Sequence, residues 1–278
     1  MSELVTIDLN EGVADVRLNR PDKYNALSQD MFAEITRAGT SLAQDPSVRC
    51  VVLSGNGRGF CAGLDFGSFQ AMAGDQGSQR KSGNGAAKAP TPSGPANPAQ
   101  NGAYVWKTLP VPVIAAVHGV AYGGGFQIAM AADIRIARPD ARMSVMEIKW
   151  GLIPDMAITT TAPGVVRLDI LKELTFTGRV VAGEEARDLG LVTRLSETPL
   201  EDAQALAREI ASKSPQAIRA GKKLFAEAWG APATEALTQE AALQASLIGR
   251  PNQIEAVMAN MEKRTPSFAD VSATEENA

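Results

Sequence analysis

The first third of the chain alternates apolar and polar positions in a way that predicts two strands, a helix and a third strand. Residues Leu4–Leu9 and Val13–Asn19 have strand-like patterns, with Asn10–Gly12 as the turn between them. Ser28 is expected to be the N-cap of a helix, because apolar residues recur on one helical face after it and Pro46 ends the pattern. The residues concerned are Met31, Ile35, Ala38 and Leu42 in the helix, and Cys50–Leu53 in the buried strand that follows.

The character of the chain changes from about Gly67 to Gly102. Gly, Pro, Ser, Gln and Ala dominate this stretch, and large apolar residues are nearly absent after Met72. We predict a flexible insertion, partly disordered, inside one domain. A linker between two domains is the alternative, but the roughly 65 residues before the stretch are few for a core of their own.

The remaining pattern predicts ordered structure from Tyr104–Leu109 onwards and an almost wholly helical C-terminal part. The elements expected first are a strand at Pro112–Val117, a tight turn at Gly119–Gly125, a helix starting at Phe126–Ala132 and a strand at Asp133–Ala137. The helical part runs from about Pro199 to Lys263. Its last helix has an apolar stripe, suited to the core or to another subunit, at Ile254, Val257, Met258 and Met261. The predicted division is a core at 1–198 and a helical region at 199–278.

Composition and charge exclude several classes of protein. The 278 residues hold 27 Lys and Arg against 31 Asp and Glu, a net charge of −4, which disfavours a nucleic-acid partner. Two cysteines and one histidine are too few for a disulfide framework or a Cys/His zinc site, so no metal is expected. The apolar stretch Val111–Ala132 is long enough to span a bilayer. Because Pro112, His118 and Gln127 interrupt it, we read it as strand, turn and helix, with no membrane partner. The N-terminus lacks a signal-peptide pattern, and a cytoplasmic location is expected.

Two glycine-rich turns are the first candidates for chemistry. Arg58–Asp65 and Gly123–Gly125 each join a predicted strand to a predicted helix. Glycine lets the backbone turn tightly and approach a ligand, and free N–H groups at a helix start attract negative charge. Two such turns can direct two N–H groups at one developing oxyanion. The alternative is a pair of tight turns with no ligand.

The order and spacing of five segments resemble the crotonase superfamily of enoyl-CoA hydratases and isomerases. The resemblance implies an α/β fold, a crotonase-like (ClpP/crotonase) spiral of strand–strand–helix units with a C-terminal helical trimerisation region. It further implies an acyl-CoA substrate, no separate cofactor because coenzyme A is part of the substrate, and a homotrimer or hexamer. The segments are Asn19–Leu27, Gly59–Asp65, His118–Gln127, Met146–Pro154 and the pair Thr175–Gly178 with Ala182–Val192.

The resemblance also assigns residues to the binding of the thioester. The family's two oxyanion-hole amides match the backbone N–H groups of Leu64 and Gly124. Ala26 and Ala62 match positions that contact coenzyme A, mainly through the main chain. Asp65 is the third substrate-binding candidate, although its favoured role is to cap the following helix. Gly67 stands where many relatives have a basic residue, which puts a phosphate contact there in doubt.

The acid–base positions favour isomerisation over hydration. Hydratases of the family use two glutamates about twenty positions apart. This chain has Glu147 at the second position but Gln127 at the first. A carboxamide cannot take or give a proton at neutral pH, so it is expected only to orient a substrate or a water molecule. A single carboxylate can still move one proton between two carbons. We therefore rank double-bond isomerisation first and hydration of 2-enoyl-CoA second.

Several other assignments stay open at this stage. Asp155 matches a catalytic aspartate of dienoyl-CoA isomerases, but it also suits the N-cap of a helix near Met156. His118 is interpreted as a packed core residue, and Trp106 and Trp150 are interpreted as core or pocket wall. Cys61 has no partner base that would make it a nucleophile. A non-catalytic acyl-CoA binder, an RNA-binding member of the superfamily and a serine protease using His118 are the alternatives from other classes.

Overall fold

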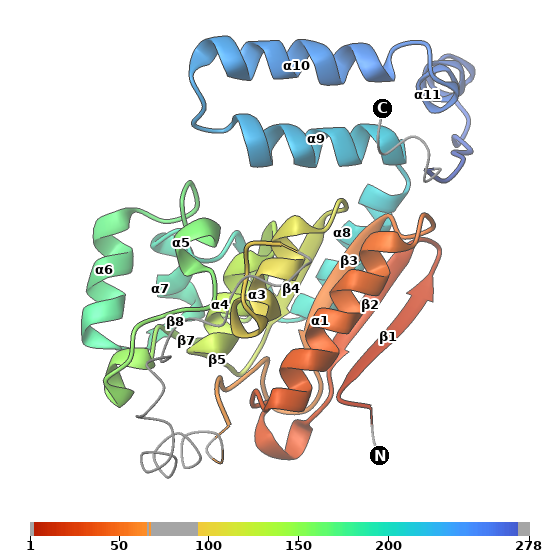
Figure 1. Ribbon diagram of the computed structural model, residues 1–278. Coiled ribbons are helices and arrows are strands. Elements are labelled where there is room, and N and C mark those ends of the chain that lie inside the picture. The colour runs from red at the N-terminus through yellow and green to blue at the C-terminus, as the bar shows by residue number, and fades with distance from the viewer. Residues whose placement is uncertain (1–2, 66, 68–93, 272–278) are drawn as a thin grey trace.

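The chain winds repeatedly between two β-sheets. The computed structural model describes residues 3–65, 67 and 94–271 (Figure 1). Within them, one sheet has the strand order β1-β2-β3-β4-β6-β9, and the other has the order β5-β7-β8. The chain leaves the larger sheet after β4 and again after β6, and it returns with β6 and β9. This alternation builds the spiral of strand and helix units that the sequence predicted.

The elements have the following bounds. The strands are β1 (Val5–Asn10), β2 (Val13–Leu18), β3 (Cys50–Gly55), β4 (Val113–Val117), β5 (Val120–Tyr122), β6 (Ile134–Ala137), β7 (Arg142–Ser144), β8 (Val181–Ala182) and β9 (Arg194–Leu195). The helices are α1 (Gln29–Gln44), α3 (Pro98–Thr108), α4 (Gly124–Ala131), α5 (Ile158–Thr161), α6 (Leu168–Thr177), α7 (Gly183–Asp188), α8 (Pro199–Ala211), α9 (Pro215–Ala228), α10 (Ala233–Leu247) and α11 (Pro251–Glu262), with 3₁₀ turns η1 (Pro21–Lys23) and η3 (Glu147–Trp150).

The larger sheet is covered on both faces, which explains why its central strands are mostly apolar. Every residue of β3 and β4 is buried. In β3, Val51 and Leu53 face the cluster that contains residues of α1, α3 and α4. The alternate residues Cys50 and Val52 face three alanines of α8. Continuous apolar runs are typical of parallel strands buried on two sides.

Helix α1 begins where the sequence predicted, and its cap gives a first test. The Ser28 side chain accepts a hydrogen bond from the Met31 N–H at 3.2 Å. Because this bond satisfies an otherwise unpaired amide at the helix start, we expect Ser28→Ala to lower the free energy of unfolding by about 1 kcal/mol. Denaturant unfolding measures it. Ser41→Ala is the control, since the Ser41 hydroxyl only bonds the Ala38 carbonyl inside the same helix. An equal loss in both variants would contradict the capping role.

Two predicted boundaries are wrong. Ordered structure resumes before Tyr104, because α3 starts at Pro98 with a capping box formed by Asn97 and Gln100. Proline at the first helical position starts a helix as readily as it breaks one. The segment 119–125 is more than a turn, since β5 forms there by parallel pairing with β7, and α4 begins at Gly124. Residues 68–93 of the predicted insertion lie outside the described part of the chain.

The C-terminal helices confirm the predicted helical content and divide into two groups. Helix α8 packs on the sheet, whereas α9, α10 and α11 extend beyond it (Figure 1). Lys222 of α9 anchors this group, because its Nζ donates to the Val111 carbonyl and to Asp133 Oδ2, both at 2.8 Å. The stripe on α11 is not buried against the core, with Met261 75 % exposed. The division at residue 198 stays a prediction. No described helix combines the length and the apolar character needed to cross a membrane.

Candidate active site

The two glycine-rich turns lie side by side, as predicted. Cys61 and Ala121 form a parallel bridge, in which the Cys61 N–H donates to the Val120 carbonyl at 2.9 Å and the Tyr122 N–H donates to the Cys61 carbonyl at 3.0 Å. A Cβ placed on Gly63 would lie 2.6 Å from the Tyr122 carbonyl oxygen. Since no side chain fits in that space, glycine allows the close approach of the two turns.

The backbone amides of Leu64 and Gly124 are brought to neighbouring positions. A Cβ on Gly63 would be 3.5 Å from the Gly124 nitrogen, and Leu27 contacts both turns through its bridge to Leu64 and its side chain near Gly124. Gly124 is the first residue of α4, where amides have no partner inside the helix. Neither amide donates a hydrogen bond within the described part of the chain. Both are therefore able to bind an oxygen atom of a ligand.

Glu147 lies against the second turn, in a setting that makes it a stronger base than an exposed glutamate. Its Oε1 would be 3.4 Å from a Cβ on Gly123, whose N–H donates to the Ser144 carbonyl at 3.0 Å. Burial raises the pKa of Glu147 above its ordinary value, and the negative charge of Asp155 adds to that effect. Its Oε2 is buried and accepts no hydrogen bond from the described residues. That oxygen is the atom of Glu147 available for proton transfer.

Gln127 holds the carboxylate of Glu147 in place. The Gln127 side chain is fully buried, and its Nε2 donates to Glu147 Oε1 at 2.6 Å. Its own Oε1 accepts from the Met156 N–H at 2.8 Å. Because a backbone N–H can only donate, this second bond fixes which end of the amide faces Glu147. One of the two hydrogens on Gln127 Nε2 is thus donated to Glu147. That the other hydrogen orients a substrate or a water molecule stays a prediction.

Asp155 does not cap a helix. Helix α5 starts at Ile158 after Ala157, which has a left-handed backbone (φ 67°), and no side chain bonds its first amides. The sequence suggested a cap because aspartate is a favoured N-cap residue and a helix was expected near Met156, but the helix starts only after the left-handed Ala157. Asp155 is exposed as a residue, yet partial burial of its carboxyl group raises its pKa. Of the two interpretations, the helix cap is therefore wrong, and the role near Glu147 stays a prediction.

Two of the three candidates for coenzyme A contact, Ala26 and Asp65, bond Arg20. The Arg20 guanidinium donates to the Ala26 carbonyl at 3.1 Å and pairs with Asp65 Oδ2 at 2.5 Å. The Ala62 N–H donates to the Tyr24 carbonyl at 2.9 Å, whereas the Ala62 carbonyl accepts no hydrogen bond from the described residues. Contact of either alanine with coenzyme A stays a prediction.

Asp65 has a structural role that its bonds define. Besides pairing with Arg20, its Oδ1 accepts from the Gly67 N–H at 2.7 Å. These two bonds, the one from Gly67 first, lower the pKa of Asp65. Such a bond from the second following amide is typical of an N-cap side chain.

Sequence reasoning missed Asn25 and Arg20, which organise these loops. The buried Asn25 Nδ2 donates to the carbonyls of Asn56, Gly59 and Phe60 at 2.9–3.1 Å. Its Oδ1 accepts from the Arg20 N–H at 2.8 Å. Both residues lie in the Asn19–Leu27 segment that carries the resemblance, but the pattern alone did not indicate what they bind.

Three other interpretations from the sequence are settled by position. His118 is half-buried and bonds the Gly57 carbonyl at 3.0 Å, so the expected packed core position is wrong. Trp106 is core, as expected, whereas Trp150 is 51 % exposed because it ends η3 at the surface. Cys61 donates its thiol hydrogen to the Asn25 carbonyl, and burial raises its pKa to about 12. A thiol held in this way is a poor nucleophile.

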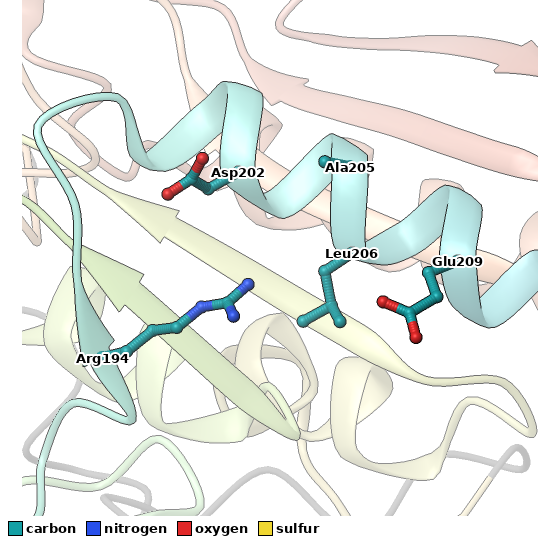
Figure 2. A pocket seen from close by; sticks show the side chains of 5 residues that line it. All are labelled: Arg194, Asp202, Ala205, Leu206 and Glu209. Carbon is teal, nitrogen blue, oxygen red and sulfur yellow. The ribbon is translucent and has the colours of Figure 1, made fainter.

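An open depression of about 300 Å³ lies elsewhere, between α8 and β9 (Figure 2). Arg194 reaches towards α8 from β9, and the helix contributes Asp202, Leu206 and Glu209. None of the predicted site residues lines it, and its lining is mixed in charge. Among the described residues, no group of three or more His, Cys, Asp or Glu side chains is arranged to hold a metal ion.

Comparisons with known proteins match almost the whole chain. Residues 8–271 match the family described as Enoyl-CoA hydratase/isomerase. The peroxisomal Delta(3,5)-Delta(2,4)-dienoyl-CoA isomerase of Arabidopsis thaliana is 32 % identical over 271 residues, covering 96 % of each chain. The mitochondrial methylglutaconyl-CoA hydratase of Mus musculus is 31 % identical, covering 93 % of this chain and 80 % of its own. A crystal structure of enoyl-CoA hydratase from Bacillus anthracis superimposes with a TM-score of 0.83 at 28 % identity, covering 95 % of this chain and 98 % of that one.

Proposed function

Since the chain belongs to the enoyl-CoA hydratase/isomerase family and is an enzyme of that family, we propose that it moves a carbon–carbon double bond in an enoyl-CoA thioester. One observation carries the choice of isomerisation. Gln127, an amide, occupies the place beside Glu147 where a second proton-transferring carboxylate would stand, and it bonds Glu147 Oε1 at 2.6 Å. Of the two residues Gln127 and Glu147, only Glu147 can act as a base, and the transfer of a single proton between two carbons requires only one base.

In the proposed mechanism the two turns stabilise the intermediate. The thioester oxygen of a 3-enoyl-CoA accepts hydrogen bonds from the N–H groups of Leu64 and Gly124. Glu147 Oε2 takes a proton from C2, and the electron pair left behind forms a dienolate whose negative charge lies on the thioester oxygen. One donor of this kind is worth roughly 3 kcal/mol of transition-state stabilisation in other enzymes. Glu147 then returns the proton to C4, which gives the conjugated 2-enoyl-CoA without any external reactant.

Hydration is the second candidate, and Asp155 is the observation that favours it. Asp155 follows Glu147 by eight positions, and its negative charge helps to raise the pKa of Glu147, which makes Asp155 the candidate for a second acidic group. Water addition needs one group to activate water and one to deliver a proton. Asp155 can supply the group that Gln127 cannot. The same residue is compatible with a dienoyl-CoA substrate, in which the proton travels further along the chain.

The test supplies 3-enoyl-CoA and 2-enoyl-CoA of equal length separately and follows the ultraviolet absorbance of the conjugated thioester. Isomerisation produces a rise with the first substrate, and hydration produces a fall with the second. Rapid loss of 2-enoyl-CoA without turnover of 3-enoyl-CoA would reverse the ranking. Tight binding of both without turnover would instead support a non-catalytic acyl-CoA binder. A salt-dependent RNA shift or labelling by a fluorophosphonate would support the remaining alternatives.

We also propose that the chain assembles into a homotrimer or hexamer through α9 to α11. Large apolar side chains on these helices are exposed, with Phe225 at 64 %, Leu237 at 61 % and Met261 at 75 %. Burying such surface between subunits is favourable. Mass measurement in solution tests the assembly. Cytoplasmic location and the lack of a cofactor besides the substrate's own coenzyme A stay predictions, since relatives include proteins named as peroxisomal and mitochondrial.

The pH dependence of the reaction is expected to report the pKa of Glu147. The base works only when ionised, so kcat/KM falls as the pH drops through its raised pKa. Asp155→Asn removes a negative charge that raises this pKa, and the acid limb of kcat/KM should therefore move to lower pH. Asp202→Asn on α8 is the matched control and should leave the limb in place. A limb that moves upward in the Asp155 variant would contradict this arrangement.

A further inference from the structure

Two buried side chains converge on Gly124, whose amide is the second predicted oxyanion donor. A Cβ placed on Gly124 would lie 2.7 Å from Leu27 Cδ1 and 2.7 Å from Met156 Sδ. Leu27 is fully buried, and Met156 is 5 % exposed. Because closely packed interiors transmit strain, a movement of either side chain is felt at the start of α4.

The backbone of Leu27 holds the first glycine-rich turn. Its N–H donates to the Gly63 carbonyl at 2.8 Å, and its carbonyl accepts from the Asp65 N–H at 3.0 Å. These two bonds lie on either side of Leu64, whose N–H is the first predicted oxyanion donor. Leu27 therefore fixes the position of Leu64 with its backbone and packs on Gly124 with its side chain.

The backbone of Met156 holds the acid–base pair. Its N–H donates to Gln127 Oε1 at 2.8 Å, and Gln127 Nε2 donates to Glu147 Oε1 at 2.6 Å. The end of the Met156 side chain also contacts α3, since its Cε would lie 3.4 Å from a Cβ on Gly102. Met156 therefore fixes Gln127 with its backbone and, like Leu27, packs on Gly124 with its side chain.

We propose that Leu27 and Met156 are positioning residues, which set the spacing between the two oxyanion amides and the carboxylate of Glu147. The inference rests on the proposed function, because it takes both amides and Glu147 to act on one thioester. Neither side chain needs to touch the substrate. The base and the two donors come from three separate segments of the chain, so they act together only when their spacing is fixed, and a small displacement costs rate.

The test measures enolate formation by bound acetoacetyl-CoA, which needs the base and the amides but no turnover. Glu147 takes a proton from C2, and the electron pair left behind spreads over the two carbonyl oxygens, which gives the enolate its ultraviolet absorbance. Met156→Ala should lower the enolate-to-ketone ratio at saturation about fivefold, because the base and the amides lose their spacing. It should lower kcat for 3-enoyl-CoA by a similar factor and leave KM within about twofold of the parent.

Two further variants distinguish positioning from general stability. Met156→Leu conserves the volume of the side chain and should stay within about twofold of the parent in enolate formation and kcat. Met31→Ala on α1 is the matched control, since Met31 is also a buried methionine of the same apolar core. It should lower the thermal midpoint much as Met156→Ala does but leave enolate formation unchanged. Equal enolate losses in the two alanine variants, or no recovery in Met156→Leu, would overturn the proposal.

Leu27→Ala tests the other contact with Gly124. It should lower enolate formation as Met156→Ala does, because the Leu64 and Gly124 amides then lose their common spacing. Circular dichroism verifies that each variant is folded. A folded Leu27→Ala protein with the enolate ratio and kcat of the parent would overturn the role of Leu27.

The enolate also separates this inference from the proposed function. A parent that forms the enolate but isomerises no 3-enoyl-CoA would contradict the proposed function, and the variants would still decide the positioning roles. A parent that isomerises 3-enoyl-CoA as well as Met156→Ala does would leave the function standing and overturn the inference. A parent that binds acetoacetyl-CoA without forming the enolate would also overturn the inference, because no joint action of base and amides would be left to position.

Discussion

Glu147→Gln is expected to lower kcat/KM for isomerisation at least about 100-fold, the scale of general acid–base catalysis. The amide keeps an oxygen that can accept the bond from Gln127 Nε2, so the site retains its shape. What it loses is the ability to take a proton from carbon. Turnover of 3-enoyl-CoA by purified variant and parent enzymes measures the effect. Turnover near that of the parent would remove Glu147 from the mechanism.

The same variant is expected to unfold at a higher temperature than the parent at neutral pH. Burial raises the pKa of Glu147 above its ordinary 4.5, so ionisation costs more in the folded chain than in the unfolded one. Ionisation of Glu147 therefore destabilises the parent once the pH exceeds the raised pKa. Below pH 4.5 Glu147 is protonated in both the folded and the unfolded chain, and the parent is not destabilised. The advantage of the variant should therefore shrink as the pH falls. Glu184→Gln, the same exchange at an exposed glutamate of α7, is the control for the substitution itself.

Gln127→Glu is expected to reduce isomerisation at neutral pH at least about tenfold and to introduce hydration of 2-enoyl-CoA. The new carboxylate would stand where Nε2 now lies 2.6 Å from Glu147 Oε1. Two carboxylates at that distance cannot both ionise, so the pair shares a proton and titrates as a unit. Isomerisation should then recover at higher pH. The hydratase resemblance implies that two glutamates at these positions divide the handling of water and proton.

The control for this change is another Gln-to-Glu exchange. Gln100→Glu lies in the capping box of α3, where glutamate serves as well as glutamine. It should leave both activities and their pH profiles unchanged. Circular dichroism verifies that the Gln127 variant is folded. If its pH profile matches that of the parent, Gln127 does not act through Glu147, and the contact between them has no catalytic consequence.

The first strands of the large sheet and helix α1 were predictable because their physical signals are local. Helix α1 has its cap at Ser28 and its apolar face in one short stretch, and both were identified from spacing alone. An apolar run also predicted the buried strand β3, although the strand extends two residues beyond the predicted end. The family membership inferred from the ordered segments is confirmed.

The errors came from signals that have two structural meanings. Pro98 ended a proline-rich stretch and was read as part of it, but Asn97 before it and Gln100 after it make it the start of a helix. Strand β5 is three residues long and forms by pairing with β7, more than twenty residues later, and with Cys61, almost sixty residues earlier. A contact of that kind leaves no trace in the local pattern.

The candidate site was predicted in its residues but not in its bonds. Gln127 and Glu147 were named together, and the structure places them 2.6 Å apart. The sequence did not indicate that Met156 would hold the other end of the amide, since that bond depends on a loop whose helix starts late, after Ala157. Likewise, the spacing of the apolar residues did not predict that Trp150 would be exposed at the end of η3.

The bond from the Met156 N–H to Gln127 Oε1 bears on how this enzyme can evolve. Either oxygen of a glutamate would accept that bond as well as the amide carbonyl does. In the genetic code, glutamine and glutamate are separated by a single base change. Because the backbone accommodates both side chains, a lineage can pass between one-acid and two-acid chemistry without first rebuilding the surrounding loop.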